Sequence, residues 1–414
     1  MRSRRSGLTA LALALAGSLA VAACGGSKPS EEGKQTVTMW IYPVIADDAA
    51  HKQFWSEATQ RFTTANPNIE VKVEVFPWAN RDQALATAIA GGKAPDVVYL
   101  IPDQLPKYAN SIEPADGYLD GAAKADYLPN VVKSVTIDGK MMGAPILTSA
   151  LSLICNKKVF ADAGQTTYPS TWDELLAMAP TFKAKGFDVA TYFGDVKNTL
   201  NTSFYPLLWQ AGGDVFSADG KSVAFNSDAG RKALTFLKQL VDGGYVDKTM
   251  LTTTPPNEQT RFAQNKVACL WTLTPTDVEK FWGKDNIKVL PPLKQSTTMQ
   301  YGTVGSLVML KSTKAKAAAG KWISFATAAE TAKTYDQKSG FFGARKSVGA
   351  IYGGDPVQGE LEKYVGTTTV GPLHPKARDV MGVLAPEIQA ALLGKKSVEQ
   401  ALADAAKAAA PLLG

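Results

Sequence analysis

Histidine and cysteine are scarce in this chain, which argues against a metal centre. The 414 residues include two histidines and three cysteines. His51 and His374 are far apart in the sequence, and no second histidine or cysteine stands at ligand spacing from either of them. We therefore expect neither a bound metal nor another cofactor.

The sequence also lacks the motifs of the common enzyme classes. It has no Gly-x-Ser-x-Gly elbow, no phosphate loop and no zinc-binding helix motif. A glycosidase requires only two carboxylates a few ångströms apart, and Asp103 with Asp214 or Glu258 would satisfy that requirement, so this class stays open. The balance favours a binding protein that is not an enzyme.

A large excess of positive charge is missing as well. The formal charge of +6 falls to about +3 (41 basic against 38 acidic residues) once the three N-terminal arginines are set aside. This charge does not suit a nucleic-acid partner. Beyond the N-terminus the most apolar segments, residues 144–154 and 304–310, are too short and too broken by polar residues to span a bilayer.

The N-terminal stretch carries the pattern of a secretory signal. Three arginines, the last of them Arg5, precede an uncharged run over residues 7–22 that is rich in Leu and Ala. Small residues then lead into Cys24, and this arrangement resembles the lipobox of bacterial lipoproteins. The resemblance implies cleavage of residues 1–23, acylation of the Cys24 thiol and an extracytoplasmic protein held to the cell membrane by lipid. An ordinary secreted protein with an incidental cysteine is the alternative.

The other two cysteines each lie in an apolar, strand-like run. Cys155 ends the run 151–155, and Cys269 lies within 267–271. In a compartment that permits disulfides they would form either a bridge between adjacent strands or two separate buried thiols. The sequence leaves both possibilities open.

Strand and helix patterns alternate along the chain in two groups. In the first group, strands are expected at residues 37–41, 69–76 and 97–101, with helices at 47–63 and 83–90 between them. The alternation predicts a parallel, doubly wound α/β sheet.

The second group begins near residue 151, and its pattern predicts another α/β lobe. Its expected elements are strands at 151–155 and 267–272, a helix capped at Ser170 or Thr171 and a helix near 229–241. A further strand at 306–311 is followed by an Ala-rich helix, and no Gly/Pro-rich linker separates the groups. We therefore expect two lobes between which the chain crosses more than once.

Several local motifs follow one another along nearly all of the chain after the signal. The clearest are Asn66-Pro67-Asn68, Ala90-Gly91-Gly92-Lys93-Ala94-Pro95-Asp96, Asp138-Gly139-Lys140-Met141-Met142-Gly143-Ala144-Pro145, Pro169-Ser170-Thr171-Trp172-Asp173-Glu174-Leu175, Trp209-Gln210-Ala211-Gly212-Gly213-Asp214 and Arg261-Phe262-Ala263-Gln264-Asn265. In this order they resemble the extracellular solute-binding proteins of ABC importers, in the sugar-binding branch that includes maltose-binding protein. Met142 and Cys155 stand where relatives usually carry an aromatic residue.

This resemblance implies a two-lobed periplasmic-binding-protein fold of type II with a multi-strand hinge. The implied N-terminal lobe comprises residues 36–146 and 305–344, and the C-terminal lobe 147–304 and 345–414, behind a lipidated tether at 24–35. The implied function is capture of a sugar, in particular an oligosaccharide, by a monomer that delivers it to ABC permease subunits with a cytoplasmic ATPase. A glycerophosphodiester or another polar solute is the alternative ligand.

A sugar site needs planar hydrogen-bond partners for hydroxyls and aromatic rings for the sugar faces. The resemblance places Asp103 where relatives carry a carboxylate, Ser149 where a relative carries glutamate, and Arg345 at the last crossover, where an arginine often reaches the ligand. A helix cap is the alternative role for Asp103. The remaining candidates are aromatic or amide residues near strand ends or in the second lobe: Tyr42, Trp78, Asn201, Tyr205, Trp209 and Trp271.

Overall fold

The computed structural model describes residues 33–414. The expected signal, Cys24 and most of the expected tether therefore lie outside the described residues. Within the described part, no helix combines the length and the apolar character needed to cross a membrane.

The first lobe is built on a six-stranded sheet in the order β2-β1-β3-β13-β4, with β7 also paired to β13. The strands are β1 (Gln35–Ile41), β2 (Ile69–Val75), β3 (Val97–Leu100), β4 (Ile112–Glu113), β7 (Ala144–Thr148) and β13 (Val304–Leu310). β1 pairs in parallel with β2 and β3, as the β-α-β alternation predicts, and β13 runs antiparallel to its neighbours. Alternate β1 residues are fully buried, so one face of this strand packs on the core.

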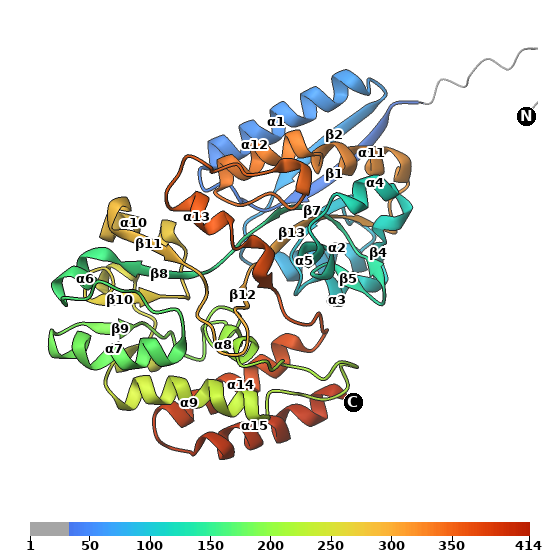
Figure 1. Cartoon of the computed structure of the whole chain (residues 1–414). Coiled ribbons are helices and arrows are strands. Elements are labelled where there is room, and N and C mark those ends of the chain that lie inside the picture. Colours follow the sequence, from blue (N-terminus) through green and yellow to red (C-terminus); the bar gives the residue numbers. More distant parts are fainter. Residues whose placement is uncertain (1–32) are drawn as a thin grey trace, which may run out of the picture. The chain divides into compact units, whose positions relative to one another are not determined.

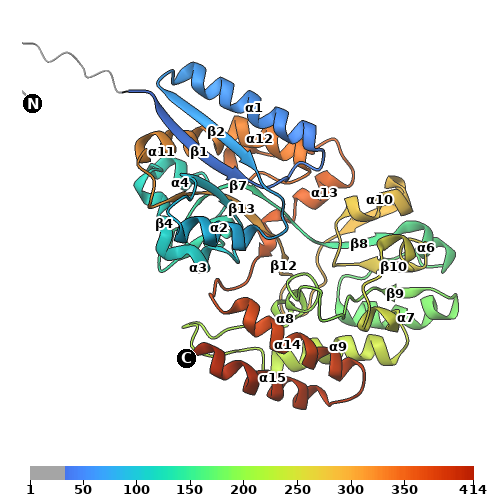
Figure 2. The same cartoon turned by 180° about the vertical axis from the view of Figure 1, so that it is seen from behind.

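Helices cover both faces of this first sheet. They are α1 (Asp48–Ala65), α2 (Arg81–Ala90), α3 (Leu105–Tyr108), α4 (Gly121–Ala125), α5 (Pro129–Lys133), α11 (Lys316–Ala326) and α12 (Ala329–Ser339). Figures 1 and 2 show α1 and α12 together over one face, with α2 and α3 on the other. The expected helices 47–63 and 83–90 correspond to α1 and α2, and the Ala-rich helix after β13 is α11.

The second lobe has a four-stranded sheet in the order β11-β8-β10-β9. The strands are β8 (Leu153–Asn156), β9 (Asp188–Ala190), β10 (Val267–Leu270) and β11 (Ile287–Leu290). This second sheet is mixed and not parallel. β8 runs antiparallel to both β10 and β11, and of the described strand pairs in this sheet only β9 and β10 are parallel. The alternation of strands and helices does not by itself show strand direction, which explains the difference.

The helices of the second lobe come from two distant parts of the chain. They are α6 (Lys157–Asp162), α7 (Trp172–Ala184), α8 (Tyr205–Gln210), α9 (Asp228–Asp242), α10 (Pro275–Trp282), α13 (Gln358–Glu362), α14 (Ala377–Leu392) and α15 (Val398–Leu413). The Thr171 hydroxyl caps α7 by accepting from the Glu174 N–H, as one of the two expected caps. The last two helices pack against each other and on α9 (Figure 1).

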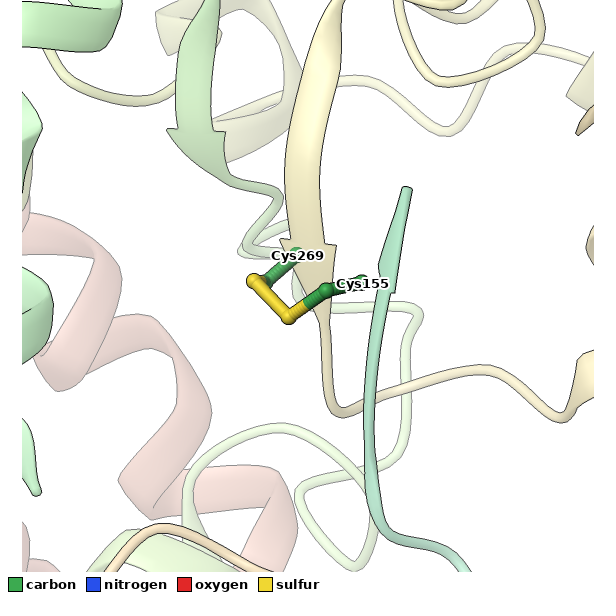
Figure 3. The surroundings of a disulfide bond; sticks show 2 residues. All are labelled: Cys155 and Cys269. Atoms are coloured by element: carbon green, nitrogen blue, oxygen red, sulfur yellow. A yellow bond between two sulfur atoms is a disulfide. The ribbon is translucent and has the colours of Figure 1, made fainter. Parts of the chain in front are cut away.

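Cys155 and Cys269 form a disulfide, which decides between the two possibilities that the sequence left open. The cysteines lie directly opposite each other on the neighbouring strands β8 and β10 (Figure 3), and both are completely buried. The bridge closes a sequence separation of 114 residues. It therefore ties the middle of the second lobe together.

Three chain segments cross between the two sheets side by side. Ser149 follows β7, and its N–H donates to the Thr303 carbonyl while its hydroxyl accepts from the Thr303 N–H, each at 2.9 Å. Thr148 forms a β-bridge to Phe342 in the third segment. A Cβ at Gly302 would lie 2.2 Å from the Ser149 carbonyl oxygen, so the close approach of these strands requires glycine there.

The lobe boundary near residue 345 lies further along the chain than expected. Ala344 and Val348 pack in the core of the first lobe, and the Arg345 side chain binds that lobe as well. Val357 belongs to a different core cluster, which includes residues of β8 and β10. The third crossing therefore delivers several residues to the first lobe after its β-bridge at Phe342.

Two small sheets complete the strand pairing. One joins β5 (Thr136–Ile137) to β6 (Lys140–Met141), and the other joins β12 (Gln300–Tyr301) to β14 (Thr368–Thr369). β12 lies just before the second crossing segment, so the second small sheet brings the chain after α13 back to the crossing region.

Candidate functional site

A cavity of about 410 Å³ lies where loops of the first lobe, the crossing segments and the second lobe meet. The first lobe contributes the turn after β3, and the second lobe contributes the loop after β9, helix α8 and the start of α14. Its walls include Pro102, Asp103, Val196, Lys197, Asn198, Thr199, Asn201, Tyr205, Trp209, Val215, Phe216, Tyr301, Thr303, Val370, Gly371, Pro372, Leu373, His374, Ala377, Arg378, Met381 and Gly382. This volume is in the range of small-molecule sites in proteins.

Asp103 is held at the cavity by the turn that follows β3. The neighbouring Gln104 is almost fully buried, its side-chain oxygen accepts from the Ile101 N–H at 3.1 Å, and its amide group donates to the carboxylate of Asp82. The Gln104 N–H also donates to the Ile101 carbonyl, which closes the turn. These bonds fix the backbone of Asp103 at the carboxyl end of a strand, where open α/β sheets bind ligands.

The two oxygens of the Asp103 carboxylate have different surroundings. Oδ2 accepts from the Arg378 guanidinium, with Nε at 3.1 Å. Among the residues that the structure describes, the buried Oδ1 has no hydrogen-bond partner. A carboxylate with one oxygen paired and one free can accept a hydrogen bond from a hydroxyl group in the cavity. No helix N–H bonds to this carboxylate, so the structure does not show the alternative role of Asp103 as a cap.

Helix α8 supplies an aromatic wall. Tyr205 and Trp209 lie one turn apart, and their ring centroids are 6.1 Å from each other. Both side chains are almost fully buried by the rest of the protein. The Tyr205 hydroxyl has no hydrogen-bond partner within residues 33–414. Burial, together with the charge of Asp214, raises the pKa of this phenol, so it remains protonated and able to donate. The Trp209 indole N–H donates to Asp214 at 3.4 Å, which fixes the orientation of its ring.

The backbone after β14 packs closely on this wall. Gly371 has φ +74°, and a Cβ there would lie 2.9 Å from Cζ2 of Trp209. Glycine is needed at this position both for the backbone conformation and for contact with the indole ring. The Gly371-Pro372 pair therefore shapes one side of the cavity.

His374 contributes a neutral ring to the wall. It stacks on Phe216 with centroids 4.3 Å apart, and its Nδ1 accepts from the Lys376 N–H at 3.1 Å. Burial lowers the pKa of His374 below its usual value, with only partial compensation from a hydrogen bond to Gly220. The imidazole is thus uncharged near neutral pH and serves the site as an aromatic surface.

The structure brings four of the nine predicted ligand residues to this cavity: Asp103, Asn201, Tyr205 and Trp209. Tyr42 and Trp78 stack on each other at 5.0 Å in the first lobe, with the Arg81 guanidinium 4.7 Å from the Trp78 ring. Trp78 is 37% exposed, whereas Tyr42 is buried and its pKa is raised to about 12 by that burial. This stack is not part of the cavity wall.

The structure does not place the other three predicted residues at the cavity. Ser149 is used in the crossing segments, where its hydroxyl accepts from the Thr303 N–H. Trp271 is 2% exposed in the core of the second lobe, and its indole N–H donates to the Ser203 carbonyl. Ser149 was expected near the ligand because a relative carries glutamate there, and Trp271 because it follows a strand, but the polar groups of both side chains already bind the protein backbone.

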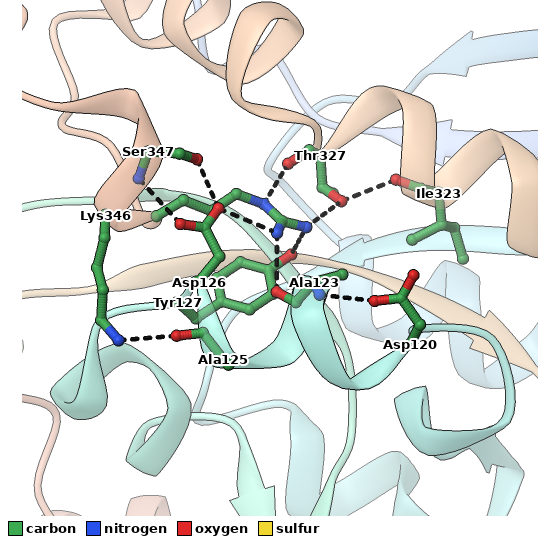
Figure 4. Close-up of polar contacts among 10 residues, drawn as sticks. Asp120, Ala123, Ala125, Asp126, Tyr127, Ile323, Thr327, Lys346 and Ser347 are labelled. Carbon is green, nitrogen blue, oxygen red and sulfur yellow. Dashed lines mark hydrogen bonds and ion pairs between the residues drawn. The ribbon is translucent and has the colours of Figure 1, made fainter.

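Arg345 is the clearest departure from expectation. Its guanidinium donates to the carbonyls of Thr327 and Ala123 and to the Tyr127 hydroxyl, at 2.6–2.8 Å, and it lies 4.0 Å from the Tyr127 ring. Figure 4 shows Ala123, Tyr127 and Thr327 close together in this part of the first lobe. Asp126 is 3.5 Å from it, and the side chain is almost fully buried. Arg345 therefore joins α4, α11 and the third crossing segment within the first lobe, and it does not line the cavity.

The carboxylates considered for a glycosidase pair do not meet in the cavity. Glu258 lies on an exposed turn, paired with Lys280 at 2.6 Å. Asp214 lies behind the wall, where its carboxylate accepts from the Val215 N–H and the Trp209 indole, and burial raises its pKa. Within residues 33–414, no group of three or more His, Cys, Asp or Glu residues could hold a metal ion.

Several cavity residues had no signal that singled them out in the sequence. Arg378 lies at the start of an amphipathic helix, where an arginine is ordinary, and Tyr301 belongs to a strand of two residues. Gly371-Pro372 predicts a turn but not its contact with an indole. All of these positions are distant from Asp103 in sequence.

Comparisons with known proteins agree with this architecture. A family model described as bacterial extracellular solute-binding protein matches residues 46–333. A protein of Brucella abortus (strain 2308) is 25% identical over 406 residues, which cover 95% of this chain and 96% of that protein. The diacetylchitobiose binding protein DasA of Streptomyces coelicolor is 28% identical over 225 residues, covering 52% of this chain and 51% of DasA.

Solved structures share the fold. The cyclic α-maltosyl-1,6-maltose binding protein of Arthrobacter globiformis has a TM-score of 0.79 at 21% identity, covering 92% of this chain and 99% of that one. The sugar-binding protein MalE of Xanthomonas citri gives the same score and identity and covers 92% and 97%. These neighbours establish the type II periplasmic-binding-protein fold. The family model matches well over half of this chain, and the chain therefore belongs to the bacterial extracellular solute-binding proteins.

Proposed function

We propose that this protein binds a sugar, in particular an oligosaccharide, in the cavity at Asp103 for delivery to an ABC transporter. The observation that carries the proposal is the free, buried Oδ1 of Asp103 in a cavity that also has the aromatic wall of α8. A buried polar atom without a partner is costly, and a sugar hydroxyl would satisfy it.

The remaining wall suits the other surfaces of a sugar. Trp209 and Tyr205 offer rings for the C–H faces, and Asn201 offers an amide with donor and acceptor atoms for hydroxyls on the rim. Similar proteins bind sugars of more than one ring, such as diacetylchitobiose and cyclic α-maltosyl-1,6-maltose. Their ligands support an oligosaccharide here as well.

The arrangement of the lobes supports a receptor rather than an enzyme. Each lobe supplies part of the wall, so a sugar that contacts both would shift the population toward the closed form. We infer that the closed, loaded monomer docks on permease subunits that are coupled to a cytoplasmic ATPase. The family members and structural neighbours are binding proteins, which supports the same conclusion.

A thermal-shift screen of the purified protein tests the ligand. The panel should contain monosaccharides, oligosaccharides and glycerophosphodiesters, and a sugar that binds should raise the melting temperature. If a glycerophosphodiester alone stabilises the protein, the ligand is a phosphate-bearing molecule and not a sugar. If the protein releases product from a glycoside, it is a glycosidase and not a receptor.

A substitution at Asp103 then tests the site. Asp103→Ala should weaken binding of the stabilising sugar by roughly 2 to 4 kcal/mol, because a buried hydroxyl would lose a charged acceptor. Asp116→Ala is the matched control, since it removes an exposed carboxylate of the same lobe that pairs with Lys124 away from the cavity. Equal affinities of the two variants, measured by calorimetry, would exclude Asp103 as a ligand residue.

We also propose that Cys24 is acylated and anchors the protein to the outer face of the cell membrane. The support is the lipobox-like sequence before Cys24 and the extracellular character of the family. Cys24→Ser should release the protein from the membrane fraction and abolish the lipid mass on its N-terminal peptide. An unchanged membrane fraction would require a different anchor.

A further inference from the structure

One ion-pair cluster connects the two lobes beside the cavity. Arg378 lies in the first turn of α14, a second-lobe helix whose residues Val380 and Leu384 are fully buried in the core of that lobe. Its guanidinium reaches the Asp103 carboxylate of the first lobe, and its Nη1 lies 3.9 Å from Oδ2 of Asp82. The cation thus belongs to one lobe and both carboxylates belong to the other.

The first-lobe side of the cluster is rigidly built. Asp82 is in the first turn of α2, and its other carboxylate oxygen accepts from the buried Gln104 amide. Gln104 in turn holds the backbone turn that carries Asp103. Both carboxylates therefore present a fixed pair of acceptors to the guanidinium, which favours a planar, forked donor over a flexible ammonium.

The exposure of the partners suits an ion pair that opens and closes. The Arg378 side chain is 59% exposed and that of Asp103 is 26% exposed. When the lobes separate, both charges would be hydrated, so opening would not leave an unpaired charge buried in the protein. Such a pair is worth little by itself, but it acts directly on the open–closed equilibrium.

The geometry also limits direct contact between Arg378 and a sugar. Its Nε and Nη2 both serve Oδ2 of Asp103, and its Nη1 faces Asp82. Oδ1 of Asp103 remains free for the cavity. One carboxylate can therefore bind the second lobe through one oxygen and a ligand hydroxyl through the other.

We propose that Arg378 is a positioning residue that latches the second lobe to Asp103 and Asp82 and thereby raises the population of the closed, sugar-binding form. The affinity part of this inference rests on the sugar-binding function proposed above. The closure part does not, because the cluster is complete without a ligand. Arg378 therefore sets how much of the sugar's binding free energy is spent on closing the lobes.

The first test uses the ligand-free protein. Small-angle X-ray scattering should give a larger radius of gyration for Arg378→Gln than for the wild type, because the latch is lost. Lys376→Gln is the matched control, since it removes one positive charge from the same region but breaks a pair with Asp379 on α14, within the second lobe. Lys376→Gln should scatter as the wild type does. Identical scattering of all three proteins would overturn the latch.

The second test uses maltose and diacetylchitobiose, the sugars named for similar proteins, as calorimetric probes. For a sugar that binds the wild type, Arg378→Gln should weaken affinity by roughly two- to tenfold. Arg378→Lys should recover part of this loss because it keeps the charge. When NaCl is raised from about 50 mM to about 500 mM, the affinity of the wild type for the sugar should decrease, whereas the affinity of Arg378→Gln should change little.

The outcomes separate this inference from the proposed function. If neither these probes nor any panel sugar binds the wild type, sugar binding fails while the scattering result still decides the latch. If a sugar binds the wild type and Arg378→Gln equally, the latch fails and sugar binding stands. A loss of more than about a hundredfold with unchanged ligand-free scattering would also overturn the latch, because it would make Arg378 a direct sugar contact.

Discussion

The buried disulfide of the second lobe leads to a quantitative stability prediction. Cys155→Ala/Cys269→Ala removes a bridge that closes 114 residues of chain. The chain-entropy model assigns a loop of that length about 5 kcal/mol at 25 °C, and measured native bridges contribute about 2 to 5 kcal/mol. We therefore expect the double variant to lose about 3 to 5 kcal/mol of the free energy of unfolding of this lobe.

The loss should be confined to one lobe. The closed loop contains α6, α7, β9, α8 and α9, which are all elements of the second lobe. Urea unfolding followed by tryptophan fluorescence gives the free energy change, and hydrogen exchange of backbone amides locates it. Amides of β8 and β10 should exchange faster in the variant, whereas those of β1 should keep their rates.

Two controls separate the bridge from the loss of sulfur atoms in the core. Cys155→Ala alone breaks the bridge but keeps the second sulfur, so its stability should be close to that of the double variant. A reductant should destabilise the wild type and leave the double variant unchanged. A double variant within about 1 kcal/mol of the oxidised wild type would refute the argument from loop closure.

Three further substitutions test the packing of the two lobes. Asp336 is fully buried, and in the described part of the chain neither of its carboxylate oxygens has a hydrogen-bond partner. Burial, and to a smaller extent the charge of Glu362, raises the pKa of Asp336 well above the usual value. A raised folded-state pKa contributes stability below the unfolded pKa that is lost as the pH rises, so Asp336→Asn should be more stable than the wild type at pH about 8 and should lose that advantage near pH about 4, by urea unfolding. Gly371→Ala should cost about 1 to 2 kcal/mol and weaken sugar binding, because its φ is positive and its Cβ would meet Trp209. Gly382→Ala, in the exposed interior of α14 and also at the cavity wall, should instead add about 0.5 to 1 kcal/mol, and equal effects of the two changes would contradict this account.

The sequence was informative wherever local periodicity decides structure. The alternation in residues 69–75 predicts β2, and a Ser or Thr before an apolar helical pattern predicts the start of α7. Strand direction in the second sheet was not predicted, because β8 enters that sheet from a crossing segment whose path depends on the other lobe. Pairing of Cys155 with Cys269 follows from that path and was open for the same reason.

The predicted ligand residues that line the cavity have positions set by one nearby element, and their contact with a ligand stays a prediction. Asp103 follows the end of β3, and Tyr205 and Trp209 lie one turn apart on α8, so their places depend on a few neighbouring residues. Arg345 also follows a crossing segment, but a buried side chain with five hydrogen-bond donors needs acceptors, and the backbone carbonyls of Ala123 and Thr327 supply them inside the lobe. The position of Arg345 in the sequence therefore predicted a place at the cleft, whereas in the structure this side chain packs inside the first lobe.

The arginine that does lie at the cavity shows the opposite situation. Arg378 is 275 residues from Asp103 in sequence, and an Arg in the first turn of a helix gives no reason to expect an acidic partner in another lobe. The contact arises because the chain after α13 returns through β14 to the crossing segments and begins α14 beside the turn after β3. Two locally ordinary charges thus acquire a joint role only through the path of the chain. The same path makes their pairing sensitive to the separation of the lobes, which is the property that a ligand-controlled closure requires.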